Sequence, residues 1–496
     1  MKSSDSIYLR IENNAKLYGN KSANLLELNE ICKDTKENNI QVTVPLFLPI
    51  HDDIIKNHLD KYANEWRSVW KIVVEKQNNE NHTLDTDSKN HLKNLRNLIK
   101  DCFNKYPIQI DTLKFSNDDL LMVRSTGFED TVDVANPGGN KSLAAIKNTE
   151  KDISTAIGKV IASYFSEKSL MQRLLSGDSI QKDPFMPVLI QKMIGEKLEG
   201  EEKLENIVAS GVMYAKEEGM TRIDVAPGHG ELIVNSKAPF DTFEVSEYDI
   251  VHAEIHKKPY RVIPTEIIDE KDHPKRKLIL KNNPENLQKK PALPSNIAIC
   301  ISHIGREIAK HYGMPMDIEF IYEANKNVLN IVQARPIPAK KEKITASTID
   351  PDIWRTIKKD PEVKIIKLEV IASAGNAVKW ISEFKQVLFT DTISIALRNY
   401  LDNEESKKIL GVIVNESAPS TSHEAAQFNA MGIPVFKSEI FKIKNFLNEK
   451  NVRCILDVQH QSMVIYKSQL NEQSIVPGLY VSSKIPKKNI IKNRAS

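Results

Sequence analysis

Residues 316–337 read MDIEFIYEANKNVLNIVQARPI, two runs rich in apolar residues on either side of the polar turn EANKN. This pattern predicts two strands that pair with each other across the turn. Successive side chains of a strand point to opposite faces of the sheet. In the first strand, Asp317 and Glu319 therefore share one face, and Ile318 and Phe320 share the other.

The second strand of this pair carries Gln333 and Arg335 on one face by the same rule. Pairing of the strands would bring two carboxylates, an amide and a guanidinium onto one surface. Carboxylate and amide oxygens suit Mg²⁺, and an arginine suits phosphate oxygens. A polar sheet face with ordinary salt bridges would show the same alternation, so the pattern supports both interpretations.

The segment STSHEAAQFNAMGIPVF, residues 420–436, follows the apolar run GVIVN and predicts a short helix. Thr421 and Glu424 have the spacing of a capping box, and Gly432 stands where a helix C-terminus favours glycine. His423 would then lie in the first turn, where free N–H groups and the helix dipole favour a bound anion such as a phosphoryl group. A surface histidine beside a helix cap is the alternative interpretation.

Three glycine-containing turns could present backbone N–H groups to phosphates, and their residues are 17–25 (LYGNKSANL, with Lys21), 135–142 (ANPGGNKS) and 226–234 (APGHGELIV). We expect residues 135–142 to open a helix that runs from about 142 to 165. Neither the G-x-x-x-x-G-K-[ST] nor the G-x-G-x-x-G spacing is present. Each of the three segments could therefore also be a plain turn.

The remaining pattern predicts a chain in which helices and strands are mixed. We expect a strand at 118–125 that ends near Arg124, which could be a phosphate ligand or an ordinary surface arginine. The other expected elements are helices within 51–115 interrupted by a loop at 77–90, a sheet across 187–260, a surface excursion at 267–293, and a helix at 295–312 with Ile297, Cys300, Ile301, Ile304 and Ile308 on its apolar face.

Composition excludes several classes of protein. The 496 residues suggest two or three domains, at roughly 150 residues per domain. A formal net charge of +3 argues against a strongly basic nucleic-acid-binding protein. No run of 18 apolar residues predicts a membrane span, and the N-terminus lacks the apolar segment of a signal peptide. The four scattered cysteines favour neither a zinc site nor a disulfide framework. A cytoplasmic location fits best, with export without a classical signal left open.

Taken in order, these segments resemble the dikinase family of phosphoenolpyruvate synthase, pyruvate phosphate dikinase, glucan water dikinase and rifampin phosphotransferase. GNKSANLLEL is similar to the family's GGKGANLxEL, and VRSTGFED followed by PGGNKS is similar to VRSSATAED and its glycine loop. VLIQKMI, SGVMYA, GHGELIV and HYGMPMDIEF…NIVQARPI have counterparts of their own. STSHEAAQFNAMGIPVF resembles GGxTSHAAIxARxxGIP, the segment that carries the family's phosphorylated histidine.

The resemblance implies an α+β and α/β multidomain chain with an ATP-grasp domain followed by a swivelling phosphohistidine domain. On this basis we expect the ATP-grasp domain at residues 1–340, a linker at 341–364, the phosphohistidine domain at 365–480 and a basic flexible tail at 481–496. We expect no barrel that binds phosphoenolpyruvate or pyruvate, because too few residues follow the histidine segment.

The resemblance also implies roles for individual residues. Lys21, Arg124 and Arg335 would hold ATP phosphates, while Glu319 and Gln333 would ligate Mg²⁺ with Asp317 beside them. The remaining implied ATP contacts are Gly138 and Gly139 in the closing loop, Gln191, Lys192, Met193 and Ile194 at the adenine edge, and Glu231 near the nucleotide. His423 would be the nucleophile and phosphate carrier, steadied by Thr421.

This sequence departs from the family pattern around the histidine and at the N-terminal turn. Ala418-Pro419-Ser420 replaces the glycine pair before the histidine, and Phe428-Asn429 replaces the usual Ala-Arg after it. In the first motif, Asn20 and Ser22 replace two glycines.

The hypothesis that follows is an AMP-forming phosphotransferase that uses ATP and Mg²⁺. It would carry the β-phosphate on His423 to an unidentified acceptor, either a small molecule or a partner protein, without nucleic acid or membrane. The second phosphate would go to water or to inorganic phosphate. Two alternatives stay open: a catalytically silent ATP-binding scaffold, and an ATP-grasp ligase that forms an acyl phosphate without the histidine.

Overall fold

The computed structural model of the chain divides into two compact units, residues 1–338 and 339–496, and each is described by itself. In the first unit the structure describes residues 3–337 apart from 34, 38, 80–84, 113, 128–139, 168, 171–172, 174–182, 196–206, 231–238 and 269–273. In the second it describes 364–367, 369–372, 387–390, 411–414, 428, 433–438, 452–457 and 462–467.

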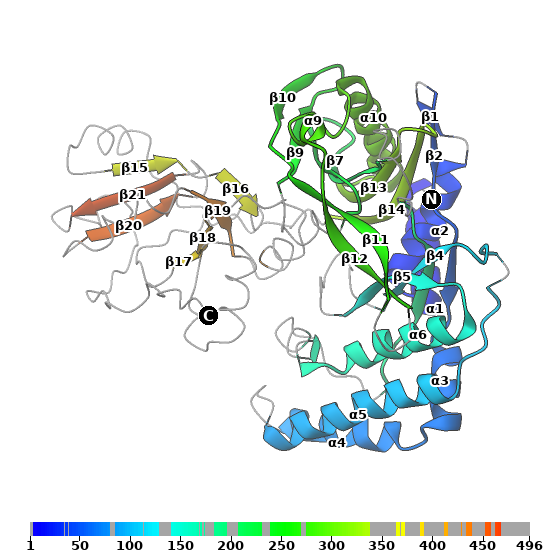
Figure 1. Ribbon diagram of the computed structural model, residues 1–496. Helices are drawn as coiled ribbons and strands as arrows, with labels where there is room; N and C mark the ends of the chain where they lie inside the picture. Colours follow the sequence, from blue (N-terminus) through cyan, green and yellow to red (C-terminus); the bar gives the residue numbers. More distant parts are fainter. Residues whose placement is uncertain are drawn as a thin grey trace. The chain divides into compact units, whose positions relative to one another are not determined.

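An eight-stranded sheet forms the centre of the first unit (Figure 1). Its spatial order is β1 (Lys36–Glu37), β2 (Ile40–Thr43), β14 (Val328–Pro336), β13 (Met316–Glu323), β7 (Ala209–Ala215), β8 (Thr221–Pro227), β9 (Asp241–Val245) and β10 (Ile250–Glu254). Neighbouring strands are antiparallel except β2 and β14, which are parallel. The predicted strand pair at 316–337 is therefore confirmed as β13 and β14.

Helices α2 (Asn20–Cys32) and α10 (Ser295–Tyr312) of the same unit pack against this sheet, and α1 (Ser3–Tyr18) packs against these two helices. The bounds of α10 match the predicted helix, and it ends at Gly313 in a left-handed conformation. Cys300, Ile301, Ile304 and Ile308 are buried against the sheet as expected, whereas Ile297 is only partly buried. Burial of these apolar side chains is what joins the helix to the sheet.

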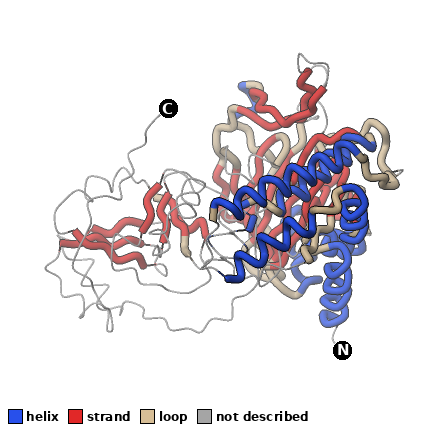
Figure 2. Tube along the Cα trace, turned by 90° about the horizontal axis from the view of Figure 1, so that it is seen from below, coloured by secondary structure: helices blue, strands red, loops and turns tan. Residues whose placement is uncertain are grey.

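A second, four-stranded antiparallel sheet runs in the order β3 (Phe47–Ile50), β6 (Val188–Lys192), β4 (Leu120–Ser125) and β5 (Ser142–Lys147). Helices α3 (Asp52–Tyr62), α4 (Trp66–Asn79), α5 (Thr86–Lys105) and α6 (Glu150–Tyr164) share one apolar core with it. Seen from below in Figure 2, helices lie in front of the strands. Trp66, Trp70 and Phe165 are fully buried in this core.

The helix predicted from about 142 to 165 is wrong over its first eight residues, 142–149. Residues Ser142–Lys147 form strand β5, which pairs with β4, and α6 begins only at Glu150. Thr149 sets that start, because its side chain accepts a hydrogen bond of 3.1 Å from the backbone N–H of Asp152. Lys141 accordingly leads directly into a strand and not into a helix, and residues 135–139 of the predicted turn lie outside the described part of the chain.

The predicted surface excursion at 267–293 is largely regular structure. β11 (Tyr260–Ile268) and β12 (Pro274–Asn282) form a two-stranded hairpin, followed by the short helix α9 (Glu285–Gln288). A buried ion pair between Lys258 Nζ and Asp241 Oδ1, 2.6 Å apart, anchors the base of this hairpin to β9. Strand β12 runs across to β5, so the hairpin joins the two sheets of the unit (Figure 1).

The described residues of the second unit form two small sheets. One is antiparallel, in the order β15 (Lys364–Lys367), β21 (Ser462–Lys467) and β20 (Val452–Asp457). The other has the order β16 (Glu369–Ala372), β19 (Val435–Lys437), β18 (Gly411–Val414) and β17 (Val387–Thr390), with parallel pairing from β17 to β19. Val412, Ile413 and Phe436 are fully buried, as expected for strands of an apolar core.

The first unit mixes helices with sheets, and the described residues of the second unit form sheets and include the helical residue Phe428. The expectation of a chain that mixes α and β structure is therefore confirmed at that level. Within the part of the chain that the structure describes, no helix combines the length and the apolar character needed to cross a bilayer.

Candidate functional site

The polar residues of the predicted strand pair lie together as the alternation requires. Asp317 is the cross-strand partner of Arg335, and Glu319 is the partner of Gln333. Arg335 donates from Nε to Asp317 Oδ2 over 2.7 Å, and its Nη2 lies 2.6 Å from the same oxygen. The chain irregularity after Glu319 shifts the register only beyond these two pairs. The hairpin thus presents a fixed row of charged and amide groups.

Arg124 reaches this row from the other sheet. It is the penultimate residue of β4, and its side chain is 11% exposed. Its guanidinium donates from Nη1 to Gln191 Oε1 over 3.2 Å and from Nη2 to Gln333 Oε1. Its Nη2 also lies 3.7 Å from Glu319 Oε2. One arginine therefore links an amide of its own sheet to an amide and a carboxylate of the eight-stranded sheet.

The backbone of β14 completes the contact between the two sheets. The carbonyl of Val332 accepts hydrogen bonds from Arg124 Nη1 at 3.5 Å and from Gln191 Nε2 at 3.2 Å. Gln191 is buried in β6 and faces the eight-stranded sheet, while its neighbour Ile190 faces the helical core. The predicted residues Arg124, Gln191, Glu319 and Gln333 thus converge where the sheets meet.

This cluster has the chemistry of a site for a phosphate and a divalent cation. Glu319 and Gln333 place oxygens around one positively charged group, and Mg²⁺ takes the same kind of donor while keeping several waters or phosphate oxygens. Among the described residues, no three His, Cys, Asp or Glu side chains are grouped to hold a metal by themselves. A cation here would therefore need ligands beyond these protein carboxylates.

The turn that carries Lys21 docks onto the residues just after Arg124. Gly19 has a φ of +77°, and a Cβ there would lie 1.1 Å from the carbonyl oxygen of Thr126, so no other residue fits without displacement. The N–H of Ser22 donates to Thr126 Oγ1 over 2.9 Å. Lys21 consequently lies in the first turn of α2, directly beside the segment that follows Arg124.

His229 is a member of the cluster that the sequence argument did not select. It lies in the turn after β8, and its electrostatic neighbours are Arg124 and Glu319. Burial, followed by the charge of Arg124, lowers the pKa of His229 to about 4, and the carboxylate of Glu319 opposes this only in part. The sequence APGHGELIV indicates this residue, because a histidine between two glycines is positioned by the backbone of the turn.

The other predicted residues are less informative. Lys192 points away from Gln191 along β6, and its Nζ lies 2.7 Å from Asp119 Oδ1. Met193 and Ile194 follow the end of β6, and Met193 N–H donates to the carbonyl of Leu120 over 2.8 Å. The predicted residues that fall outside the described part of the chain are Gly138, Gly139, Glu231, Thr421 and His423.

One described residue of the histidine segment bears on its expected helix. Phe428 is helical and fully buried, and its carbonyl accepts a hydrogen bond of 2.9 Å from the N–H of Ile433. A bond over five residues is typical of a helix C-terminus. Apart from Phe428, the residues of the predicted helix lie outside the described part of the chain.

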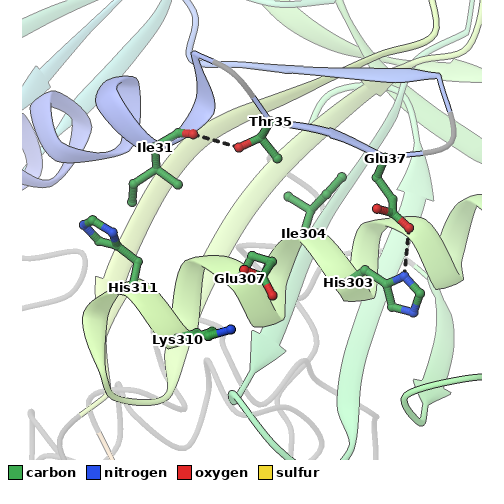
Figure 3. Close-up of a pocket in the computed structure, with 8 residues that line it drawn as sticks. All are labelled: Ile31, Thr35, Glu37, His303, Ile304, Glu307, Lys310 and His311. Carbon is green, nitrogen blue, oxygen red and sulfur yellow. Dashed lines mark hydrogen bonds and ion pairs between the residues drawn. The ribbon is translucent and has the colours of Figure 1, made fainter.

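A separate groove lies on α10, the helix that covers the opposite face of the eight-stranded sheet (Figure 3). It encloses about 450 Å³, and its lining residues are Ile31, Thr35, Glu37, His303, Ile304, Glu307, Lys310 and His311. None of them belongs to the predicted site. The groove therefore gives no support to a nucleotide position on that face.

Comparison with known proteins agrees with the geometry of the first unit. The two sheets of this unit and the polar cluster between them define a mixed α/β domain whose polar side chains are suited to binding a phosphate and a cation. Residues 15–352 match the family described as pyruvate phosphate dikinase, AMP/ATP-binding domain. Because this match covers more than half of the chain, the chain belongs to that family.

Individual relatives have low but extended similarity. A probable phosphoenolpyruvate synthase of Pyrococcus horikoshii is 25% identical over 328 residues, which is 65% of this chain and 38% of the relative. The phosphoenolpyruvate synthase of Aquifex aeolicus is 26% identical over 370 residues, 68% of this chain and 40% of the relative. Rifampicin phosphotransferase of Bacillus subtilis is 22% identical over 274 residues, 51% and 28% respectively. The chain thus spans about two fifths or less of the length of these relatives.

Proposed function

We propose that the chain is an ATP-dependent phosphotransferase that binds ATP and Mg²⁺ between the two sheets of its first unit. The observation that carries this proposal is the convergence of Arg124, Glu319 and Gln333 from different sheets onto one point. Membership of an AMP/ATP-binding family, together with relatives named as phosphoenolpyruvate synthases and a rifampicin phosphotransferase, supports it.

Each residue of the cluster has a role that its chemistry permits. Arg124 and Arg335, with Lys21, would neutralise phosphate oxygens, since guanidinium groups bind such oxygens in a bidentate manner. Glu319 and Gln333 would ligate Mg²⁺ beside the phosphates. Asp317 would orient Arg335 through the 2.7 Å hydrogen bond to its Nε. Bound Mg²⁺ would supply neutralisation of charge on the phosphates.

The group transfer itself would use His423 of the second unit. A neutral ring nitrogen attacks the β-phosphorus of ATP, a nitrogen–phosphorus bond forms, and the bond to the α-phosphate oxygen breaks to release AMP. The terminal phosphate then leaves to water or inorganic phosphate, and the remaining phosphoryl group passes to the acceptor. Gly138 and Gly139 would belong to the loop that closes over the triphosphate, Glu231 would lie near the nucleotide, and the 191–194 segment would border the adenine. Thr421 would steady the phosphorylated ring.

Incubation with ATP labelled at the β-phosphate tests this proposal. We expect AMP as a product and an acid-labile label on the protein, both dependent on Mg²⁺ and both lost in His423→Ala. His252→Ala is the matched control, because His252 is an exposed histidine on strand β10 and lies in neither proposed site. Formation of ADP alone, or labelling that survives in His423→Ala, would contradict the transfer through this histidine.

A second candidate is an ATP-binding scaffold without phosphoryl transfer. It is favoured by the replacements around His423, where Phe428 stands in place of a small residue and is used as a fully buried core side chain. Binding of ATP by the wild type without AMP formation and without acid-labile label would establish this alternative.

A further inference from the structure

Two buried nitrogen atoms in the candidate site lack a hydrogen-bond partner among the described residues: Nε of Arg124 and Nδ1 of His229. Buried polar groups in folded proteins are almost always paired, so each such atom needs an explanation. The Nε–H of an arginine can only donate, whereas an imidazole nitrogen can accept. The two atoms are therefore complementary.

The two side chains also lie close enough for the charge of Arg124 to act on the ring of His229. The positive charge of Arg124 and the negative charge of Glu319 both act on the ring of His229. Both Nη groups of Arg124 are engaged, with Gln191, Val332 and Gln333 as acceptors. The Nε–H of the same guanidinium has no acceptor among the described residues.

The backbone, and not the ring, holds His229 in this position. Gly228 has a φ of +89°, and a Cβ there would lie 2.7 Å from the carbonyl oxygen of Val262. The N–H of Gly228 donates to the carbonyl of Val208 over 2.7 Å, and its own carbonyl accepts from Ser210 Oγ over 2.6 Å. The N–H of His229 donates to the carbonyl of Val262 over 2.9 Å. The backbone that carries the ring is thus held by Val208, Ser210 and Val262, while Nδ1 of the ring has no partner among the described residues.

We infer that His229 is a positioning residue that accepts the Nε–H of Arg124 when nucleotide is bound. The inference rests on the proposed function. Phosphate oxygens and Mg²⁺ would compete for the Nη groups and for Gln333 Oε1, so the guanidinium has to leave its present hydrogen bonds and turn. A single hydrogen bond to His229 Nδ1 then satisfies both buried atoms.

A histidine suits this task better than a carboxylate would. A neutral imidazole accepts the Nε–H without adding negative charge beside the phosphates, where it would repel the nucleotide. Burial keeps this ring neutral, since the pKa of His229 is lowered to about 4. Arg124 thereby keeps its full positive charge for the phosphate oxygens.

Calorimetric titration of the full chain with ATP and Mg²⁺ tests the inference. His229→Leu removes the acceptor, and we expect it to weaken ATP binding about 10-fold, the typical result of leaving a buried charged donor unpaired. His229→Asn keeps an oxygen at the position of Nδ1, three bonds from the Cα, and should bind within about threefold of the wild type. His252→Leu, on exposed strand β10, is the control and should bind like the wild type.

The partnership with Arg124 is tested in a second background. A lysine lacks the guanidinium and therefore its Nε–H donor. Adding His229→Leu to Arg124→Lys should then change the affinity for ATP by less than about twofold. Thermal unfolding of each nucleotide-free variant establishes that it is folded.

The possible results separate this inference from the proposed function. A wild type that does not bind ATP overturns both. A wild type that binds ATP while His229→Leu binds equally well overturns only the role of His229. A His229→Asn variant as weak as His229→Leu, or an undiminished loss in the Arg124→Lys background, also overturns it.

Discussion

The two faces of the eight-stranded sheet use alternate residues of the same strands for different purposes. On β13 and β14, Ile318 and Ala334 belong to one apolar core that also contains residues of α2 and α10. The residues between them, Asp317, Glu319 and Gln333, face the other way and meet Arg124 of the second sheet. A single strand pair therefore fixes the fold through one face and leaves the other face free to be polar.

Two histidines, one on each side of the sheet, have pKa values shifted in opposite directions. His229, on the polar face, is held by the backbone, and burial with the charge of Arg124 lowers its pKa. His303, on α10, has Nδ1 2.9 Å from Glu37 Oε1 and Nε2 2.8 Å from the carbonyl of Glu247 (Figure 3 shows the first contact). Both nitrogens of His303 face acceptors, so the doubly protonated ring satisfies both.

The largest effect should come from neighbouring substitutions on β13. Ile318→Ala removes a fully buried side chain and should lower the free energy of unfolding by about 2–5 kcal/mol, measured by urea denaturation. Glu319→Gln, one residue further along and 22% exposed, should change it by less than about 1 kcal/mol. If Glu319→Gln destabilised the protein as much as Ile318→Ala, the claim that the apolar face stabilises the fold and the polar face does not would be wrong.

A smaller effect concerns His303 and pH. Burial and the charge of Arg306 act to lower the pKa of His303. The hydrogen bonds to Glu37 and to the carbonyl of Glu247, together with the charge of Glu37, outweigh them, so the pKa is raised. Its contribution to stability is then fully present below the unfolded-state pKa of about 6.5 and is lost as pH rises through the folded-state value.

Urea unfolding at pH 6 and at pH 9 compares the wild type with His303→Gln. The wild type should be the more stable at pH 6, by at most about 1 kcal/mol because water screens this partly exposed pair, and the difference should shrink at pH 9. A difference that grows with pH would show that the ring is not held in its protonated form.

The sequence predicted the parts of this molecule that depend on local alternation and missed those that depend on distant partners. The shared face of Asp317 with Glu319 and the apolar face of α10 follow from periodicity, and both were correct. The start of α6 differs from the expected one because pairing with β4 makes Ser142–Lys147 a strand and because Thr149 caps the helix.

The candidate site shows the same limit. Arg124 and Gln333 were each selected from sequence, but their hydrogen bond joins residues 209 positions apart and no local pattern contains it. The place of His229 depends on the docking of its turn against β11, a contact made only in the folded chain. The assignment of His423 as phosphate carrier remains a prediction from the resemblance, since that residue lies outside the described part of the chain.

The central claim is that the polar face between the sheets binds ATP together with Mg²⁺. Titration of the full-length chain with ATP, in the presence of Mg²⁺ and then of EDTA, for the wild type and Glu319→Gln, tests it most directly. We expect binding by the wild type that depends on Mg²⁺ and is weakened at least about 10-fold in Glu319→Gln. Binding that is indifferent to both Mg²⁺ and Glu319, or no binding by the wild type, would contradict it.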